Sequence, residues 1–301
     1  MSKEKIVMSS SATPLGLNDL FSVKGKVVLV TGGGTGIGKM LAAGLVANGA
    51  KVYIASRKQQ VVDETAAELN KYYAKQGGVC LPLTANLNSK AGCDELANKI
   101  KQRETKLDAL FNNSGITWGA PMLDFPEKEG WDQLYAVNVK GPFFLTTALL
   151  PLLEKASNGN YEPATVVNVS SIGGIIASSA EGRDDDSGIA KAGSGTPSYA
   201  SSKAAVNHLT RTLATSLASR YVRVNCIAPG AFPSRMMAFG LSKPGAKQAM
   251  DSSVPLGRIG ETEDMAGLAV FLASRASAHI TGAVFTIDGG SSIIPSGQSR
   301  I

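Results

Sequence analysis

A tyrosine and a lysine stand four positions apart in the segment "PSYASSKAAV", at Tyr199 and Lys203. On a helix this spacing places both side chains on one face, one turn apart. A free phenol has a pKa of about 10, and lowering it by about three units takes about 4 kcal/mol of preferential phenolate stabilisation. A neighbouring ammonium group acts in that direction. The two residues are therefore either a surface pair on an amphipathic helix or an acid/base site in which Lys203 lowers the pKa of Tyr199.

A glycine-rich stretch, "VVLVTGGGTGIGKMLAAGL", joins an apolar run to an Ala/Leu-rich helical pattern. Backbone N–H groups at the start of such a helix can bind a pyrophosphate, and glycines let the phosphates approach closely. A nucleoside-triphosphate loop would need Ser or Thr after Lys39, and Met40 stands there instead. We therefore expect dinucleotide contacts from the loop residues Gly32, Gly34, Thr35, Gly36, Ile37 and Gly38.

The second apolar run ends in Ser56, Arg57 and Lys58. A dinucleotide site that selects NAD usually has an acidic residue here, which binds the ribose 2′-hydroxyl. A hydroxyl and two cations suit a 2′-phosphate instead, because an arginine can bind it with two hydrogen bonds. A solvated basic turn is the alternative. The position at the end of the strand favours the phosphate contact, so we expect NADP(H) as the cofactor.

Seven short apolar runs alternate with helical patterns along the chain, at 26–30, 51–56, 80–85, 107–113, 164–171, 222–229 and 283–289. Most are nearly continuously apolar and do not alternate with polar residues, which is typical of strands buried on both faces of a parallel sheet. Strand–helix alternation at this spacing predicts βαβ units with right-handed crossovers. The expected fold is α/β: a single Rossmann-type doubly wound domain with a seven-stranded parallel sheet and helices on both faces.

We expect this domain to cover residues 21–290, between a flexible N-terminal extension (1–20) and a C-terminal tail (291–301). Within it, the polar and acidic residues 178–195 predict a surface insertion. Residues 231–253, rich in Met, Gly, Ser and Lys, have the character of a flap over the substrate.

Composition excludes several classes of protein. The net charge is +6, but Lys and Arg are scattered without a basic stripe, so no nucleic-acid partner is expected. No uninterrupted apolar run approaches the roughly 20 residues of a membrane span, and no membrane partner is expected. Three cysteines without metal spacing and only two histidines predict no metal site and a reducing compartment. We expect a cytoplasmic protein, although the terminal Ser-Arg-Ile loosely matches a peroxisomal address.

Several motifs occur together: TGxxxGxG at 31–38, "NNSG" at 112–115, Asn138, Ser171, Tyr199 with Lys203, and "PG" at 229–230. This set resembles the short-chain dehydrogenase/reductase family over roughly residues 22 to 290. Within that family, "NNSGITWGAP" and "IAPGAFPSRM" are most similar to the 3-oxoacyl-ACP reductase-like members related to rhamnolipid biosynthesis.

The resemblance implies roles for the catalytic residues. Tyr199 would be the acid/base, and Lys203 would also hold the nicotinamide ribose. Ser171 would hydrogen-bond the substrate oxygen, with the neighbouring Ser170 as its rival, because strand alternation lets only one of them face the site. Asn138 resembles the residue that kinks the helix and holds a water for proton relay; alternatively, it is an ordinary asparagine on a polar helix face.

The resemblance also implies the remaining cofactor contacts. Residues after the third, fourth and sixth strands would line the adenine, ribose and nicotinamide: Asn86, Leu87, Asn113, Ser114, Gly115, Pro229, Gly230, Phe232 and Ser234. The chain departs from the pattern in three ways. Asn86 replaces a common Asp, Thr35 replaces a basic residue of many NADPH-preferring members, and Tyr199 follows Ser171 by 28 positions, a gap that is usually less than half as long.

The chemistry that follows is hydride transfer from NADPH to a ketone, either a 3-oxoacyl-type or a small carbonyl substrate, with Tyr199 as acid/base. A polyol or secondary-alcohol dehydrogenase running in the oxidative direction uses the same residues. A non-catalytic NADP(H)-binding regulatory protein is the alternative from another class. The resemblance further implies a homotetramer, or a homodimer.

Overall fold

The structure, a computed structural model, describes residues 15–177, 193–234, 237 and 245–293. Most of the predicted terminal segments lies outside these residues. So do residues 178–192 of the predicted insertion and residues 235–236 and 238–244 of the predicted flap. Residues Leu17–Leu20 form the short helix α1, so the end of the predicted N-terminal extension is part of the fold. The phenyl ring of Phe21, the next residue, lies 6.3 Å from that of Phe271.

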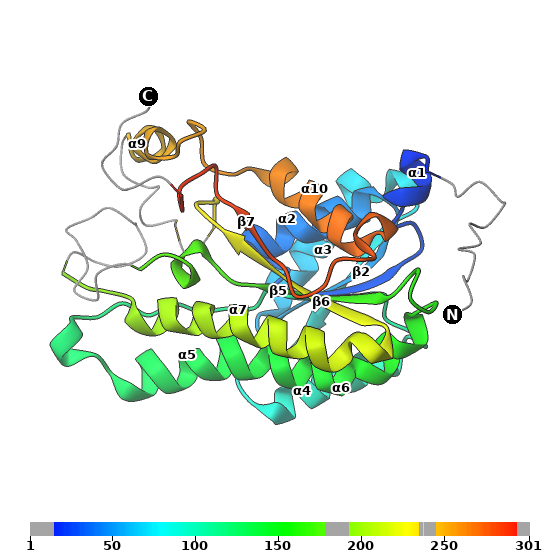
Figure 1. Cartoon of the computed structure of the whole chain (residues 1–301), viewed down its shortest axis with the longest axis horizontal. Coiled ribbons are helices and arrows are strands. Elements are labelled where there is room, and N and C mark those ends of the chain that lie inside the picture. Colours follow the sequence, from blue (N-terminus) through cyan, green and yellow to red (C-terminus); the bar gives the residue numbers. More distant parts are fainter. Residues whose placement is uncertain (1–14, 178–192, 235–236, 238–244, 294–301) are drawn as a thin grey trace, which may run out of the picture.

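Seven parallel strands form one sheet in the order β3-β2-β1-β4-β5-β6-β7 (Figure 1). Their bounds are Val27–Thr31 (β1), Lys51–Ser56 (β2), Val79–Thr84 (β3), Ala109–Asn112 (β4), Ala164–Val169 (β5), Val222–Pro229 (β6) and Val284–Ile287 (β7). Every residue of β1, β4, β5 and β6 is buried. This burial on both faces explains why these strands are mostly apolar. The predicted α/β doubly wound fold is confirmed.

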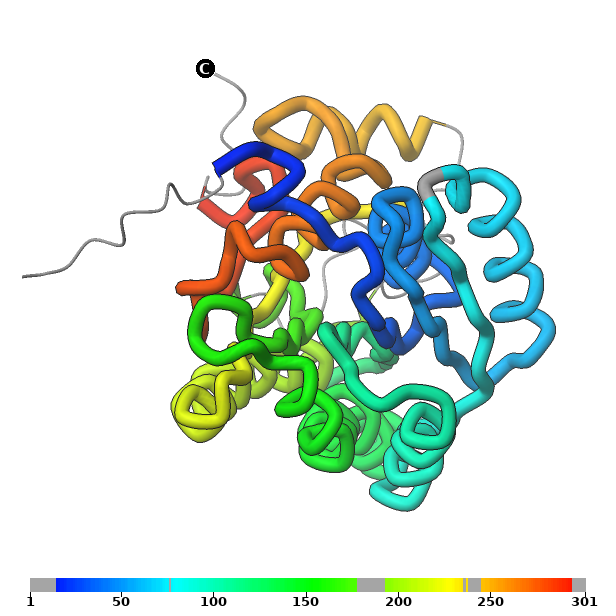
Figure 2. The backbone as a smooth tube through the Cα atoms, turned by 90° about the vertical axis from the view of Figure 1, so that its right-hand side faces the viewer, coloured from blue at the N-terminus to red at the C-terminus, as the bar shows by residue number. Residues whose placement is uncertain are grey.

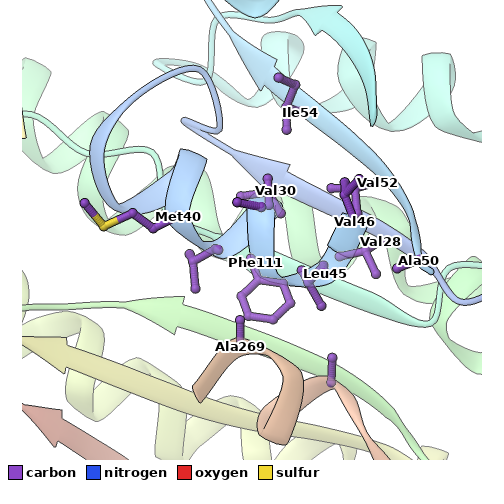
Figure 3. Close-up of a cluster of buried hydrophobic side chains, with 14 of the residues drawn as sticks. Val28, Val30, Met40, Leu45, Val46, Ala50, Val52, Ile54, Phe111 and Ala269 are labelled. Atoms are coloured by element: carbon purple, nitrogen blue, oxygen red, sulfur yellow. The ribbon is translucent and has the colours of Figure 1, made fainter. Parts of the chain in front are cut away.

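Helices cover both faces of the sheet (Figures 1 and 2). One face carries α2 (Gly36–Ala47), α3 (Gln59–Tyr73) and α10 (Thr262–Ala273); the other carries α4 (Lys90–Lys101), α6 (Gly141–Ala156) and α7 (Pro197–Leu217). The helix α9 (Ala246–Ser253) lies within the predicted flap. Between the sheet and the first set of helices, Phe111 of β4 packs among apolar side chains of β1, α2 and α10 (Figure 3).

The chain from residue 127 to 156 is helical but contains two π-helical segments, Glu127–Asp132 and Ala136–Lys140. The short α5 (Gln133–Tyr135) lies between them, and α6 follows. By length and composition this run could cross a membrane, because one window has a mean hydropathy of 1.3. Half of that window is buried inside the fold, as the core helix of a globular protein would be.

The order of strands reverses between β1 and β4, which pair side by side with Val28 opposite Ala109. In an open parallel sheet, this reversal leaves a crevice beyond the carboxyl ends of the strands, where ligands bind. The glycine-rich loop after β1 and the "NNSG" segment after β4 both lie at this point.

Candidate active site

A cavity of about 340 Å³ lies at the carboxyl ends of the strands. The predicted site residues that line it are Gly32, Gly34, Thr35, Gly36, Ile37, Gly38, Ser56, Arg57, Lys58, Asn86, Leu87, Asn113, Ser114, Gly115, Tyr199, Lys203 and Ser234. These residues come from positions far apart in the sequence, so the fold gathers most of the predicted set around one space.

The glycine-rich loop leaves little room for side chains. Gly32 has φ +66, and a Cβ there would lie 2.8 Å from Nδ2 of Asn113. Gly36 has φ +52, and its Cβ would lie 3.0 Å from Cβ of Ser234. The side chain of the N-cap residue, Thr35, makes no capping hydrogen bond to α2. The first N–H groups of a helix have no partner within the helix, and here no side chains block the approach of a ligand to them. This arrangement fits a pyrophosphate.

Arg57 and Lys58 lie on the surface at the far end of the same cavity. Neither forms a salt bridge with another described residue. Lys58 is the N-cap of α3 and makes no side-chain capping bond. Two cations beside a helix start are therefore free to meet an anionic group of a ligand in the cavity.

Tyr199 and Lys203 lie on one face of α7, as their spacing predicts, and both are buried. Nζ of Lys203 lies 5.5 Å from the centroid of the Tyr199 ring and donates a hydrogen bond to the carbonyl oxygen of Val169 at 2.9 Å. The burial of the pair and its place in the cavity exclude a plain surface pair.

The direction of the tyrosine pKa differs from the expectation. Burial raises the pKa of Tyr199, and a side-chain hydrogen bond with Ser171 opposes this effect only in part. Burial also lowers the pKa of Lys203 to about 8. The predicted lowering of the phenol pKa by Lys203 is therefore wrong for this structure. The physical reason is that removing both groups from water disfavours their charged forms, and this desolvation is the largest effect on each pKa.

The two adjacent serines after β5 have different partners. The Ser170 hydroxyl is buried and donates to the backbone carbonyl of Lys203 at 2.9 Å. The Ser171 side chain is close enough to Tyr199 to act on the pKa of the phenol, which it lowers, and its Oγ accepts a hydrogen bond from the N–H of Gly173 at 3.1 Å. The structure thus pairs Ser171 with the tyrosine, although Ser170 lines the cavity and Ser171 does not.

Asn138 lies in the π-helical segment before α6 and is buried. Its amide accepts from the N–H of Ile116 and donates to the carbonyl of Ile116, both at 2.9 Å. It also donates to Oγ of Ser202 in α7 at 3.1 Å. The alternative of an asparagine on a polar helix face is wrong, since Asn138 joins the segment after β4 to the helix that carries Tyr199.

Three predicted cofactor residues lie outside the cavity lining. Pro229 ends β6, and Gly230 packs so closely on Asp288 that a Cβ would lie 2.7 Å from the Asp288 Cβ. Phe232 is a core residue, only 2% exposed, with its ring against Gly260. Its side chain lies in the apolar core, in the same cluster as buried side chains of α10, and so does not face the cavity.

Sequence reasoning missed several residues that line the cavity: Val61, Ala85, Ile116, Val137 and Val169. Ser170, the expected rival of Ser171, lines it as well. Ala85 and Val169 stand at the carboxyl ends of strands, so strand position could have indicated them. Val61 and Val137 lie on helices, and their apolar side chains carry no signal that distinguishes a cavity wall from the core.

Comparison with known proteins adds independent information. The profile of the family described as "Enoyl-(Acyl carrier protein) reductase" matches residues 32–292. A "Rhamnolipids biosynthesis 3-oxoacyl-[acyl-carrier-protein] reductase" of Pseudomonas aeruginosa is 39% identical over 91% of this chain and 99% of its own length. The "Short-chain dehydrogenase/reductase PhomF" of Diaporthe leptostromiformis is 37% identical over 96% of this chain and 99% of its own.

A solved structure is similar as well. The "Pseudomonas aeruginosa RhlG/NADP active-site complex" superimposes with a TM-score of 0.80 at 39% identity. The match covers 91% of this chain and 99% of that one. The similarity therefore extends over the whole sheet and both helical layers.

Proposed function

The chain belongs to the short-chain dehydrogenase/reductase family, and from this we propose that it is an NADPH-dependent ketone reductase whose preferred substrates are 3-oxoacyl thioesters. The family makes the chain an oxidoreductase that acts on alcohol or carbonyl groups. The observation that carries the proposal is that Tyr199 and Lys203, both buried on α7, line the same cavity as the glycine-rich loop, with Ser171 close enough to act on the pKa of Tyr199. The rhamnolipid-type relative, named for a 3-oxoacyl substrate, supports the substrate class.

The residues present fit the cofactor. The loop from Gly32 to Gly38 would hold the pyrophosphate, Arg57 and Lys58 the 2′-phosphate, and Lys203 the nicotinamide ribose. When bound, NADPH supplies the hydride. The phosphate-binding part of this assignment stands on the lack of space for side chains in the loop and on the two surface cations without described ion-pair partners.

Proton transfer is the task of this chain's own side chains. Because burial raises the pKa of Tyr199, its hydroxyl stays protonated at neutral pH and can donate a proton to the oxygen of a ketone as negative charge develops there. Ser171 would donate a second hydrogen bond to that oxygen. The protonated hydroxyl is the form that ketone reduction uses, whereas alcohol oxidation would use the phenolate as base.

The test compares Tyr199→Phe with the wild-type protein. Ketone-dependent consumption of NADPH, followed by absorbance with 3-oxoacyl thioesters, diketones and sugars, should fall about 100-fold or more, the lower range for a lost general acid. The matched control is Tyr161→Phe, which removes the hydroxyl of a tyrosine that is 75% exposed. Undiminished turnover in the Tyr199 variant would show that another group donates the proton. Preference for sugars over thioesters would overturn the substrate class.

A further inference from the structure

The catalytic helix α7 begins without a side-chain cap. Its N-cap residue is Thr196, whose side chain makes no capping hydrogen bond, and the helix starts at Pro197. Tyr199 and Lys203 both lie within the first two turns, where a helix frays most readily. Their positions therefore depend on the contacts that hold these turns against the rest of the fold.

One side of these turns is held by α5, which lies beside the start of α7 (Figure 1). The hydroxyl of Tyr135, the last residue of α5, donates to Oγ of Ser201 at 3.0 Å. Ser201 in turn donates to the carbonyl oxygens of Pro197 and Ser198, at 2.8 and 3.1 Å. A single hydrogen-bonded path thus runs from Tyr135 into the first turn of α7, which contains Tyr199.

The next serine is held in a similar way. Ser202 accepts from Asn138, three residues after Tyr135, and donates to the carbonyl oxygen of Tyr199 at 2.7 Å. Two consecutive serines between Tyr199 and Lys203 are therefore bonded by two side chains from the α5 region. Asn138 bonds to Ser202 and not to Ser201. Among the described residues, Tyr135 provides the hydrogen bond that joins Ser201 to another element.

The ring of Tyr135 is itself fixed. It stacks on Trp131 with ring centroids 5.8 Å apart and planes at 27°, and Trp131 meets Phe125 edge to face at 6.1 Å. Gly130 has no room for a side chain, because a Cβ there would lie 2.9 Å from Cδ1 of Phe125 and closer still to Cε1 of the same ring. Packed aromatic rings lose little freedom when their polar end forms a hydrogen bond, so the Tyr135 hydroxyl is well placed in advance.

We propose that Tyr135 is a positioning residue of the reductase. Through Ser201 it holds the first turn of α7 in the arrangement in which Tyr199 meets Ser171. The proposal rests on the function proposed above. Tyr135 need not touch substrate or cofactor, and its effect passes through the helix that carries the proton donor.

The experiment uses Tyr135→Phe, which keeps the aromatic stack and removes the hydroxyl, together with Ser201→Ala and the double variant. We expect kcat for ketone reduction to fall about tenfold in each single variant, which is less than the roughly 100-fold loss that a 1 Å misplacement can cause. The double variant should lose no more than either single one, because both break the same path. The KM for NADPH should stay within about twofold of the wild-type value.

Hydrogen exchange of the free protein gives a readout that does not depend on activity. Amides of residues 198–203 should exchange faster in both single variants than in the wild type. The matched control is Tyr53→Phe, which removes a tyrosine hydroxyl bonded to Glu104, remote from α7, and should leave both kcat and this exchange unchanged.

Wild-type kcat and exchange in the Tyr135 variant, or additive losses in the double variant, would overturn the positioning role. If Tyr135→Phe does not fold, Ser201→Ala decides the question by the same two measurements. A wild-type protein that reduces no ketone would contradict only the proposed function, since hydrogen exchange at residues 198–203 still tests the contact between α5 and α7.

Discussion

Burial of Lys203 beside the proposed proton donor lowers the stability of the folded protein. Burial lowers its pKa from 10.5 to about 8, which corresponds to about 3 kcal/mol. Between pH 8 and 10.5 the folded chain binds fewer protons here than the unfolded chain, so this contribution to stability rises with pH; below pH 8 the full penalty applies. Lys203→Met removes this penalty but also loses the hydrogen bond to Val169, which contributes about 1 kcal/mol. We therefore expect the free energy of unfolding of the variant at pH 7 to exceed that of the wild type by about 2 kcal/mol.

Urea unfolding at pH 7, 9 and 10 measures this difference. It should shrink steadily above pH 8, while ketone reduction by the variant is lost at every pH. A matched substitution, Lys75→Met, removes an exposed lysine and should leave the free energy of unfolding nearly unchanged. A stability difference between Lys203→Met and wild type that does not vary with pH would show that the ammonium carries no such penalty.

At the scale of elements, the sequence predicts the strands closely because burial on both faces leaves a clear apolar signal. The predicted run at 51–56 coincides with β2 and that at 222–229 with β6, while 107–113 extends beyond β4 at both ends. The π-helical segments around α5 have no such signal; in the second of them, Asn138 bonds to the backbone of Ile116, a residue distant in the sequence. The direction of the Tyr199 pKa was also out of reach, because it depends on how completely the fold removes water.

The turn between β2 and α3 carries the next prediction. Arg57 and Lys58 lie at one end of the cavity, and a charge-assisted pair with a phosphate contributes about 1.5–3 kcal/mol. Arg57→Ala should therefore raise the Kd for NADPH by about tenfold or more and leave that for NADH nearly unchanged. Fluorescence titration of both cofactors measures the ratio; Arg103→Ala, an exposed arginine on the surface after α4, is the control. An unchanged ratio would assign the 2′-phosphate contact to other residues.

At the scale of the whole molecule, the cavity joins distant parts of the chain. Its walls come from the loop after β1 and the turn after β2 on one side, and from "NNSG" and α7 on the other. A ligand that binds only this folded arrangement stabilises all of it, by about 2.7 kcal/mol when its concentration is 100 times Kd. We therefore expect NADPH at that excess to raise the Tm by roughly 5 °C or more. NADH at the same concentration should raise it less, because it lacks the 2′-phosphate. Differential scanning calorimetry measures both shifts, and equal shifts for the two cofactors, or none, would contradict the assignment of this cavity to NADPH.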